Sequence, residues 1–205
     1  MKNLTFYTNP RSRGRIARWM LEEVGEAYDT VLLDFQGTMK EAGFVAMNPM
    51  GKVPVIRHGD TIVSEAAAIC AYLADAFPRR QLAPALNDRG AYYRWLFFAA
   101  GPLEAAVTAK ALGLLAPPEK SAMAGYGSFE KTIDALEAAV AGREFVAGDH
   151  FTAADVYVGS QIGWGLMFGT IEKRPAFSDY VGRLHARPAF QRGNVLDDAA
   201  VPSNA

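Results

Sequence analysis

The chain has 205 residues, of which 50% are hydrophobic and 21% are charged, and its formal net charge is −1. This length and composition indicate a soluble globular protein with one large or two small domains. The charge is balanced and has no basic run, which argues against a nucleic-acid-binding protein. No stretch reaches the roughly 18 consecutive apolar residues of a membrane span, which argues against a membrane protein. The single cysteine argues against a scaffold built on disulfides or on cysteine-bound zinc.

Residues 1–78 alternate between strand-like and helix-like patterns. The chain enters a strand at 4–7 without a signal-peptide region, so we expect a cytoplasmic protein. Ser12 can cap the helix that follows, and Ser64 can cap a later one. The remaining segments are a strand expected at 28–33, a short helix at 38–47 and a hairpin whose two strands are expected at 53–56 and 61–63. The order β-α-β-α-β-β-α matches a thioredoxin-like domain, with a right-handed crossover between its first two strands.

Residues 79–86 are predicted to form a linker, because the stretch from Pro78 through Pro84 breaks the pattern. Everything beyond the linker has helical patterns, so residues 87–205 are predicted to form an all-α domain. The fold class expected is therefore an α/β thioredoxin-like domain over 1–78, followed by an all-α helical domain.

Four features within the helical part carry expectations of their own. Gly101-Pro102 predicts a kink in a long helix, and Pro117-Pro118 is expected to open another helix that continues to Gly142. The Thr152-Ala-Ala-Asp155 pattern predicts a capped helix start, to which we assign a role in packing. The tail 191–205 is polar, and we expect little order there.

The stretch from Lys52 to Ala66 combines features that suit one ligand. Val53 precedes a proline, so it is held extended, and its backbone N–H and C=O can pair with a peptide. The helix start after Ser64 offers N–H groups to an anion, while Glu65 offers a carboxylate to a cation. An extended peptide with both an α-carboxylate and an α-ammonium would satisfy all of these groups.

Two motifs in this region, Asn48-Pro-x-Gly-Lys-Val-Pro54 and Glu65 followed by Ala-Ala-Ile-x-x-Tyr-Leu73, resemble the cytosolic glutathione S-transferase family, in particular its bacterial members. The resemblance extends from Leu4 to about Phe190. It implies the glutathione transferase fold and a cis peptide bond before the proline of the first motif. It also implies a glutathione site that comprises Lys40, Lys52, Val53, Pro54, Glu65 and Ala66. Where the family usually has Glu/Asp-Ser, this chain has Glu65-Ala66, from which we expect weaker glutathione binding.

The first strand is followed by Thr8-Asn9-Pro10-Arg11-Ser12, which contains no cysteine, so the reactive thiol has to arrive with the ligand. A free thiol has a pKa of about 8.5, and only the thiolate is a good nucleophile. A hydroxyl group or a helix N-terminus beside the sulfur lowers that pKa. Three alternatives remain open for this role. The pattern of many bacterial relatives favours Ser12, ungapped alignment on theta-, zeta- and tau-like relatives favours Thr8, and Asn9 or a backbone N–H is the third.

The predicted function is conjugation of the glutathione thiolate to small hydrophobic electrophiles in detoxification, by a homodimer that has glutathione as co-substrate. The residues predicted to line the second-substrate pocket, between the two domains, are Tyr7, Trp95, Phe98 and Trp164. No metal is expected, because the histidines lack ligand spacing. The alternatives are a glutathione-dependent disulfide oxidoreductase or peroxidase, and a non-catalytic glutathione-transferase-like binding module.

Overall fold

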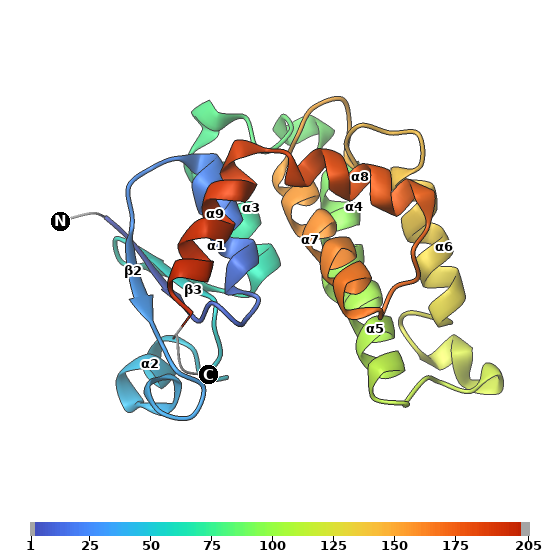
Figure 1. The fold of residues 1–205 in the computed structure, drawn as a ribbon, viewed down its shortest axis with the longest axis horizontal. Helices are drawn as coiled ribbons and strands as arrows, with labels where there is room; N and C mark the ends of the chain where they lie inside the picture. The colour runs from blue at the N-terminus through green and yellow to red at the C-terminus, as the bar shows by residue number, and fades with distance from the viewer. Residues whose placement is uncertain (1–2, 202–205) are drawn as a thin grey trace. The chain divides into compact units, whose positions relative to one another are not determined.

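The computed structural model describes residues 3–201. The chain divides into two compact units, the first made of Met1–Gln81 with Arg187–Ala205 and the second of Leu82–Ala186 (Figure 1). The first unit is of the α/β type and the second is helical, which confirms the predicted fold class. The grouping differs from the predicted domain 87–205 in one respect, because the residues after Ala186 join the first unit.

In the described part of the first unit, four strands form a mixed sheet in the order β2-β1-β3-β4. The strands are β1 (Leu4–Thr8), β2 (Asp29–Leu32), β3 (Val55–His58) and β4 (Thr61–Ser64). β1 pairs in parallel with β2 and antiparallel with β3. Buried and half-buried side chains alternate along β1, as the period of two of a strand requires, with Leu4, Phe6 and Thr8 buried.

The helices of the first unit are η1 (Thr38–Lys40), α1 (Gly14–Val24), α2 (Ala42–Met47), α3 (Ala66–Ala76), η2 (Pro78–Arg80) and α9 (Pro188–Ala199). Three helical regions of this unit, α1, η1 with α2, and α3, lie where the sequence predicts helices, whereas η2 and α9 were not predicted. α1 packs against both α3 and α9 (Figure 1). The expected helix caps are wrong in detail: α1 begins two residues after Ser12, and Ser64 is the last residue of β4.

The expectation of little order over 191–205 is wrong for the described part of that tail, because α9 is a regular helix; residues 202–205 lie outside the described part. Several polar side chains of α9 pair with side chains of α1. Asp197 forms an ion pair with Arg18 over 3.1 Å, and both side chains are buried. Phe190 packs edge-on against Trp19, with ring centroids 5.0 Å apart.

The second unit is a group of helices. They are η3 (Leu86–Asp88), α4 (Gly90–Phe98), η4 (Ala99–Leu103), α5 (Glu104–Ala111), η5 (Pro118–Met123), α6 (Phe129–Val140), α7 (Ala153–Phe168) and α8 (Pro175–His185). The predicted irregularity at Gly101-Pro102 is present as the π-helical segment η4. A single helix from Pro117 to Gly142 is wrong, because Gly127, at φ +65°, interrupts it and Ser128 caps a new helix.

The predicted capping pattern at the start of α7 is confirmed as a complete capping box. Asp155 is fully buried and its carboxylate accepts hydrogen bonds from the Thr152 N–H, the Val146 N–H and the Tyr180 hydroxyl, at 2.7 to 2.9 Å. These donors come from the loop before α7, from its cap residue Thr152 and from α8. The box therefore ties several segments of the second unit together, in agreement with a role in packing.

Candidate functional site

The loop between β1 and α1 brings the two candidate hydroxyl groups to the same helix start. A Cβ added to Gly14 would lie 2.0 Å from Thr8 Oγ1 and 3.0 Å from Ser12 Oγ, so both hydroxyls press against the first residue of α1. Only glycine fits there. Thr8 is fully buried, and its Oγ1 has no hydrogen-bond partner among residues 3–201. Ser12 is half-buried and so remains within reach of a ligand.

Asn9 and Ser12 fix the shape of this loop. The Ser12 hydroxyl donates to the Asn9 carbonyl over 2.7 Å and accepts from the Gly14 N–H over 2.9 Å. The Asn9 side-chain amide donates to the carbonyl of Leu33 over 2.8 Å, and its Oδ1 accepts from the Arg11 N–H over 2.9 Å. Asn9 therefore acts on the backbone of the loop, whereas Ser12 has a hydroxyl proton that could be turned from a carbonyl to an incoming sulfur.

The segment before β3 has the backbone expected for the peptide-binding edge. The Val53–Pro54 peptide bond is cis, as the family resemblance implies. Asn48 shapes the turn before it, since its side-chain amide donates to the Lys52 carbonyl over 2.8 Å. Lys40 donates to the Gly51 carbonyl over 2.9 Å, so its ammonium supports the turn in addition to any ligand contact. The Lys52 side chain is exposed beside Val53.

The start of α3 is open. Its cap position is taken by Glu65, which has φ +66° and ψ 119°, an uncommon conformation for a residue with a side chain. Within the described residues no side chain caps this helix, so its first N–H groups, beginning with that of Ala66, are left for an external acceptor. Glu65 is exposed beside them. Strained backbone at an open helix start is typical of a binding site.

Comparison with known proteins identifies the family. Residues 12–76 match the glutathione S-transferase N-terminal domain, and residues 104–164 match the glutathione S-transferase C-terminal domain. Glutathione S-transferase GstB of Escherichia coli is 31% identical over 184 residues, which cover 84% of this chain and 88% of GstB. This chain belongs to the glutathione S-transferase family. By that membership it is a glutathione transferase.

Two further relatives bear on the glutathione transferase site. A sphingomonad glutathione S-transferase, solved in complex with glutathione, superimposes with a TM-score of 0.76 at 28% identity and covers 95% of this chain and 98% of its own. The disulfide-bond oxidoreductase YghU of Escherichia coli is 28% identical over 240 residues, covering 98% of this chain and 77% of YghU. The family thus includes proteins named for two different reactions.

The residues predicted to line the second-substrate pocket of this transferase fall into separate parts of the molecule. Tyr7 is half-buried in the first unit and packs against Phe44, with ring centroids 6.1 Å apart. Trp95 and Phe98 lie together on α4, with centroids 5.4 Å apart, and Trp95 is largely buried. Trp164 is half-buried on α7. A pocket shared by these residues stays a prediction.

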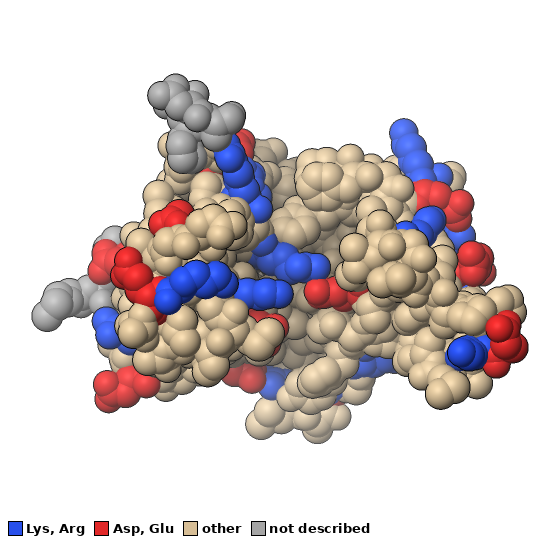
Figure 2. All heavy atoms as spheres, turned by 90° about the horizontal axis from the view of Figure 1, so that it is seen from below, with Lys and Arg blue, Asp and Glu red and all other residues tan. Residues whose placement is uncertain are grey.

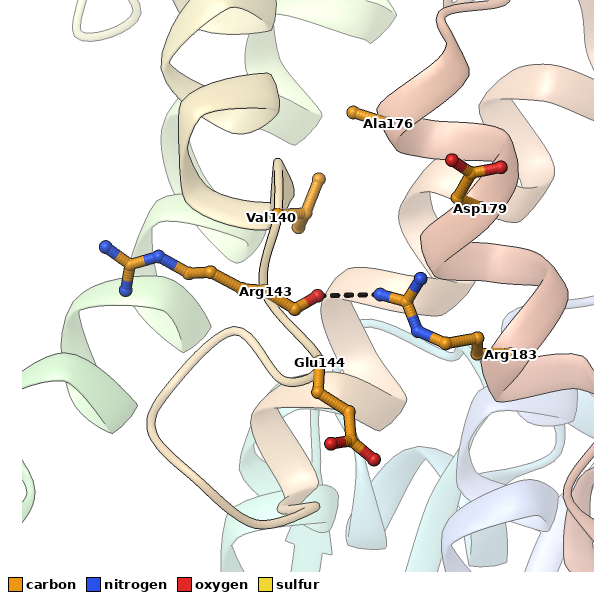
Figure 3. Close-up of a pocket in the computed structure, with 7 residues that line it drawn as sticks. Val140, Arg143, Glu144, Ala176, Asp179 and Arg183 are labelled. Carbon is orange, nitrogen blue, oxygen red and sulfur yellow. Dashed lines mark hydrogen bonds between the residues drawn. The ribbon is translucent and has the colours of Figure 1, made fainter.

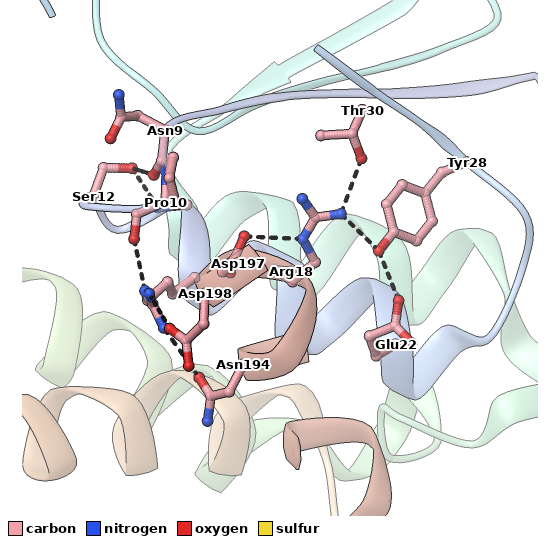
Figure 4. A network of polar contacts seen from close by, with 12 residues as sticks. Asn9, Pro10, Ser12, Arg18, Glu22, Tyr28, Thr30, Asn194, Asp197 and Asp198 are labelled. Carbon is pink, nitrogen blue, oxygen red and sulfur yellow. Dashed lines mark hydrogen bonds and ion pairs between the residues drawn. The ribbon is translucent and has the colours of Figure 1, made fainter. Parts of the chain in front are cut away.

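Two arginines of α1 are functional neighbours that the sequence did not reveal. Arg18 is only 4% exposed, although arginine side chains mostly lie at the surface. It pairs with Asp197 and also donates to Tyr28 and Thr30, each over 2.9 Å (Figure 4). Arg15 donates to the Pro10 carbonyl in the candidate loop. No local pattern could have indicated these contacts, because the α9 partners lie 179 or more residues away along the chain.

One cavity in the second unit lies apart from every predicted site residue. It has a volume of about 410 Å³ and is lined by Val140, Gly142, Arg143, Glu144, Ala176, Asp179 and Arg183. Arg183 donates across it to the carbonyl of Arg143 over 2.6 Å (Figure 3). Its charged lining is exposed at the ends of α6 and α8, and none of the glutathione-site motifs contributes to it.

Metal-ligand groups, membrane-spanning helices, surface charge and the single cysteine complete the description of the chain. Residues 3–201 contain no group of three or more His, Cys, Asp or Glu side chains placed to hold a metal ion. In the same part of the chain, no helix is both long and apolar enough to cross a bilayer. Side chains of both charges are interspersed on the face shown in Figure 2. Cys70 is fully buried, and burial raises the pKa of its thiol, so it is no nucleophile.

Proposed function

We propose that this protein conjugates the thiolate of glutathione to small hydrophobic electrophiles. The observation that carries the proposal is the pair of hydroxyls, Thr8 and Ser12, held against Gly14 at the start of α1 in a loop that has no cysteine. A thioredoxin-like domain that has no cysteine in this loop must use the thiol of its ligand. The loop supplies what that sulfur needs, which is a hydroxyl donor and the positive end of a helix.

Glutathione would bind along the edge formed by the cis-proline segment and the start of α3. The Val53 backbone, beside Pro54, would pair with the cysteinyl part of the peptide. The Glu65 carboxylate would bind the α-ammonium, and the N–H of Ala66 with the open first turn of α3 would bind the α-carboxylate. Lys52 and Lys40 would lie toward the glycyl carboxylate at the other end.

The Ser12 or Thr8 hydroxyl and the start of α1 can together supply the free energy needed to lower the pKa of the glutathione thiol. Lowering the pKa of a thiol from about 8.5 to 7 takes about 2 kcal/mol of preferential interaction with the thiolate. A hydrogen bond to a charged group contributes about 1.5–3 kcal/mol, and a helix N-terminus contributes about 0.3–1 kcal/mol. One hydroxyl of Ser12 or Thr8, together with the start of α1, is therefore sufficient. The electrophile would meet the sulfur beside aromatic side chains, and those predicted are Tyr7, Trp95, Phe98 and Trp164.

The experiment that tests the proposal is a glutathione titration followed by the ultraviolet absorbance of the thiolate at neutral pH. Saturable binding with a thiolate signal, and turnover of an aryl halide, are expected. Binding without a thiolate signal would contradict conjugation and favour a binding module. Absence of binding at millimolar glutathione would overturn the assignment of the site.

A second candidate function is glutathione-dependent reduction of disulfides or hydroperoxides. The observation that favours it is the similarity to YghU, a protein named as a disulfide-bond oxidoreductase. This reaction would use the same glutathione site, but the glutathione sulfur would attack a disulfide or a hydroperoxide instead of an electrophilic carbon. Turnover of a mixed disulfide of glutathione that exceeds conjugation of an aryl halide would favour this function.

The setting we propose for either reaction is a cytoplasmic homodimer that needs no metal and takes part in detoxification. Analytical ultracentrifugation of the pure protein tests the dimer directly. Activity that survives prolonged treatment with a chelator is expected, since neither proposed reaction needs more than the thiol and the groups around it.

A further inference from the structure

We propose that Arg15 is a positioning residue for the glutathione thiolate, which fixes the β1–α1 loop by bridging it to α9. The inference rests on the proposed function, since it names what holds the loop that would carry the thiolate. It assigns a part in the site to Asp198 of α9, which lies 183 positions further along the sequence.

The guanidinium of Arg15 makes two strong contacts in opposite directions. Its Nε donates to the carbonyl of Pro10 over 2.6 Å, and its terminal nitrogen pairs with the Asp198 carboxylate of α9, also over 2.6 Å. The other terminal nitrogen lies 3.5 Å from Asn194 Oδ1, one turn earlier on α9. The planar fork of arginine can make these contacts at once, whereas an ammonium group is a single point of attachment.

The carbonyl that Arg15 binds is central to the loop. Pro10 lies between Asn9 and Ser12 in the loop, and the Ser12 hydroxyl donates a hydrogen bond to the Asn9 carbonyl (Figure 4). Within the loop, the Asn9 carbonyl also accepts the Ser12 N–H over 3.1 Å. These bonds set the local shape of the loop but do not attach it to anything beyond α1 and β2. Arg15 provides the link from the loop to the C-terminal helix.

α9 is a firm support for this link. Asp197, the neighbour of Asp198, forms the buried ion pair with Arg18. At the other end of the helix, Arg187 makes a forked pair with the Glu23 carboxylate over 2.6 and 2.8 Å. The Arg15–Asp198 pair is itself peripheral, since the Asp198 side chain is 67% exposed. Exposed pairs contribute little to stability, so its loss should alter the loop without unfolding the protein.

The chemical consequence is a matter of placement. A donor that is displaced by about 1 Å can lose on the order of 100-fold in rate. By holding the Pro10 carbonyl, Arg15 fixes where the Ser12 and Thr8 hydroxyls stand relative to the start of α1. The positive charge of Arg15 could also act on the sulfur through space, and this role makes a different prediction for substitution by lysine.

The test compares Arg15→Lys with Arg192→Lys. Arg192 is the matched control, because it also connects α9 with α1, through Glu22, with its Nε 3.1 Å from the carboxylate, but makes no contact with the loop. Both variants keep the positive charge and lose the fork. For Arg15→Lys we expect about a 10-fold fall in conjugation rate and a raised pKa of the bound glutathione thiol. Its unfolding midpoint in urea should move no further than that of Arg192→Lys.

A second variant, Asp198→Asn, removes the α9 side of the bridge from an exposed position and should reproduce the effect of Arg15→Lys on the thiol pKa. If Arg15→Lys and Asp198→Asn leave that pKa and the rate at the values of Arg192→Lys, the bridge has no role and the inference is overturned. If the wild-type protein itself gives no thiolate signal, the proposed function fails, and the inference fails with it. The wild-type signal therefore separates the two failures.

Discussion

Two helix starts in this protein use the same kinds of residue for opposite purposes. α7 begins with Thr152 and Asp155, whose side chains turn inward and form a buried capping box. α3 begins after Ser64 and Glu65, which by sequence could do the same, yet no side chain within the described residues caps it. The two starts differ in the backbone of the cap residue, because Glu65 has φ +66° and its exposed side chain makes no cap hydrogen bond.

The contrast teaches how a structural helix end differs from a binding one. At α7 the protein satisfies its own N–H groups, and the result is stability. At α3 it leaves them for a ligand and accepts a strained residue to do so. α1 is intermediate, since Ser12 accepts from the Gly14 N–H but keeps a hydroxyl proton that can be turned. Substitutions at the three helix starts should therefore change different measured quantities.

The largest effect is expected for Asp155→Ala at the start of α7. The substitution leaves buried donors from Thr152, Val146 and Tyr180 without an acceptor. The free energy of unfolding should fall by about 3 kcal/mol or more, as measured by urea denaturation. Thr152→Ser, which retains a hydroxyl for the cap, is the control and should change it by less than about 1 kcal/mol. An Asp155→Ala variant as stable as wild type would show that this box is dispensable.

The next effect is expected for Ser12→Ala at the start of α1. Because Ser12 is half-buried and Thr8 is fully buried, we expect the Ser12 hydroxyl to reach the sulfur. Its removal should lower kcat/KM for conjugation about 100-fold. Thr8→Val removes a buried hydroxyl that lacks a partner among the described residues, so it should leave stability unchanged or raise it by about 1 kcal/mol. A rate loss in Thr8→Val rather than in Ser12→Ala would reverse the assignment.

Gly14→Ala tests whether the close contact between the start of α1 and the Thr8 hydroxyl shapes the loop. The added Cβ would overlap Thr8 Oγ1, so the loop has to shift, and we expect a loss of about 1–3 kcal/mol in stability. The thiolate signal of bound glutathione should weaken with it. Gly182→Ala in α8 is the matched control, since its Cβ would meet nothing within 4 Å, and it should stabilise the helix by about 0.5–1 kcal/mol. Equal effects of the two substitutions on unfolding would contradict the close contact at Gly14.

The smallest effect is expected for Ala66→Ser at the start of α3. A serine restores the hydroxyl that the family usually has beside the ligand carboxylate, and one added hydrogen bond contributes about 1 kcal/mol. Glutathione should therefore bind about 5-fold more tightly in a calorimetric titration, with unfolding unchanged. An unchanged dissociation constant would place the α-carboxylate elsewhere.

The parts of this molecule that followed from its sequence depend on local patterns. The positions of the strands, the irregularity at Pro102 and the α7 capping box each follow from residues within a few positions. The cis bond at Pro54 followed from family resemblance alone. The caps assigned to Ser12 and Ser64 were wrong because backbone angles at Arg13 and Glu65, which composition does not reveal, moved each helix start.

The docking of α9 could not be predicted for a different reason. The polar sequence of the tail suggested little order, and nothing close to Arg18 in the sequence points to a partner in α9. The buried charges of Arg18 and Asp197 are explained only by each other, although 179 positions separate the two residues in the sequence. Pairs of this kind leave no periodic signal in a single chain. The bridging role inferred for Arg15 belongs to the same class.

The return of α9 to the first unit also has a consequence for synthesis. The first unit is assembled from residues before Gln81 and after Arg187, so the ribosome must translate the whole of Leu82–Ala186 before it can be completed. At about 5–20 residues per second, that interval is on the order of ten seconds. During it, the nascent chain exposes the face of α1 that carries Arg18 and Trp19, a surface on which a chaperone could act before α9 closes it.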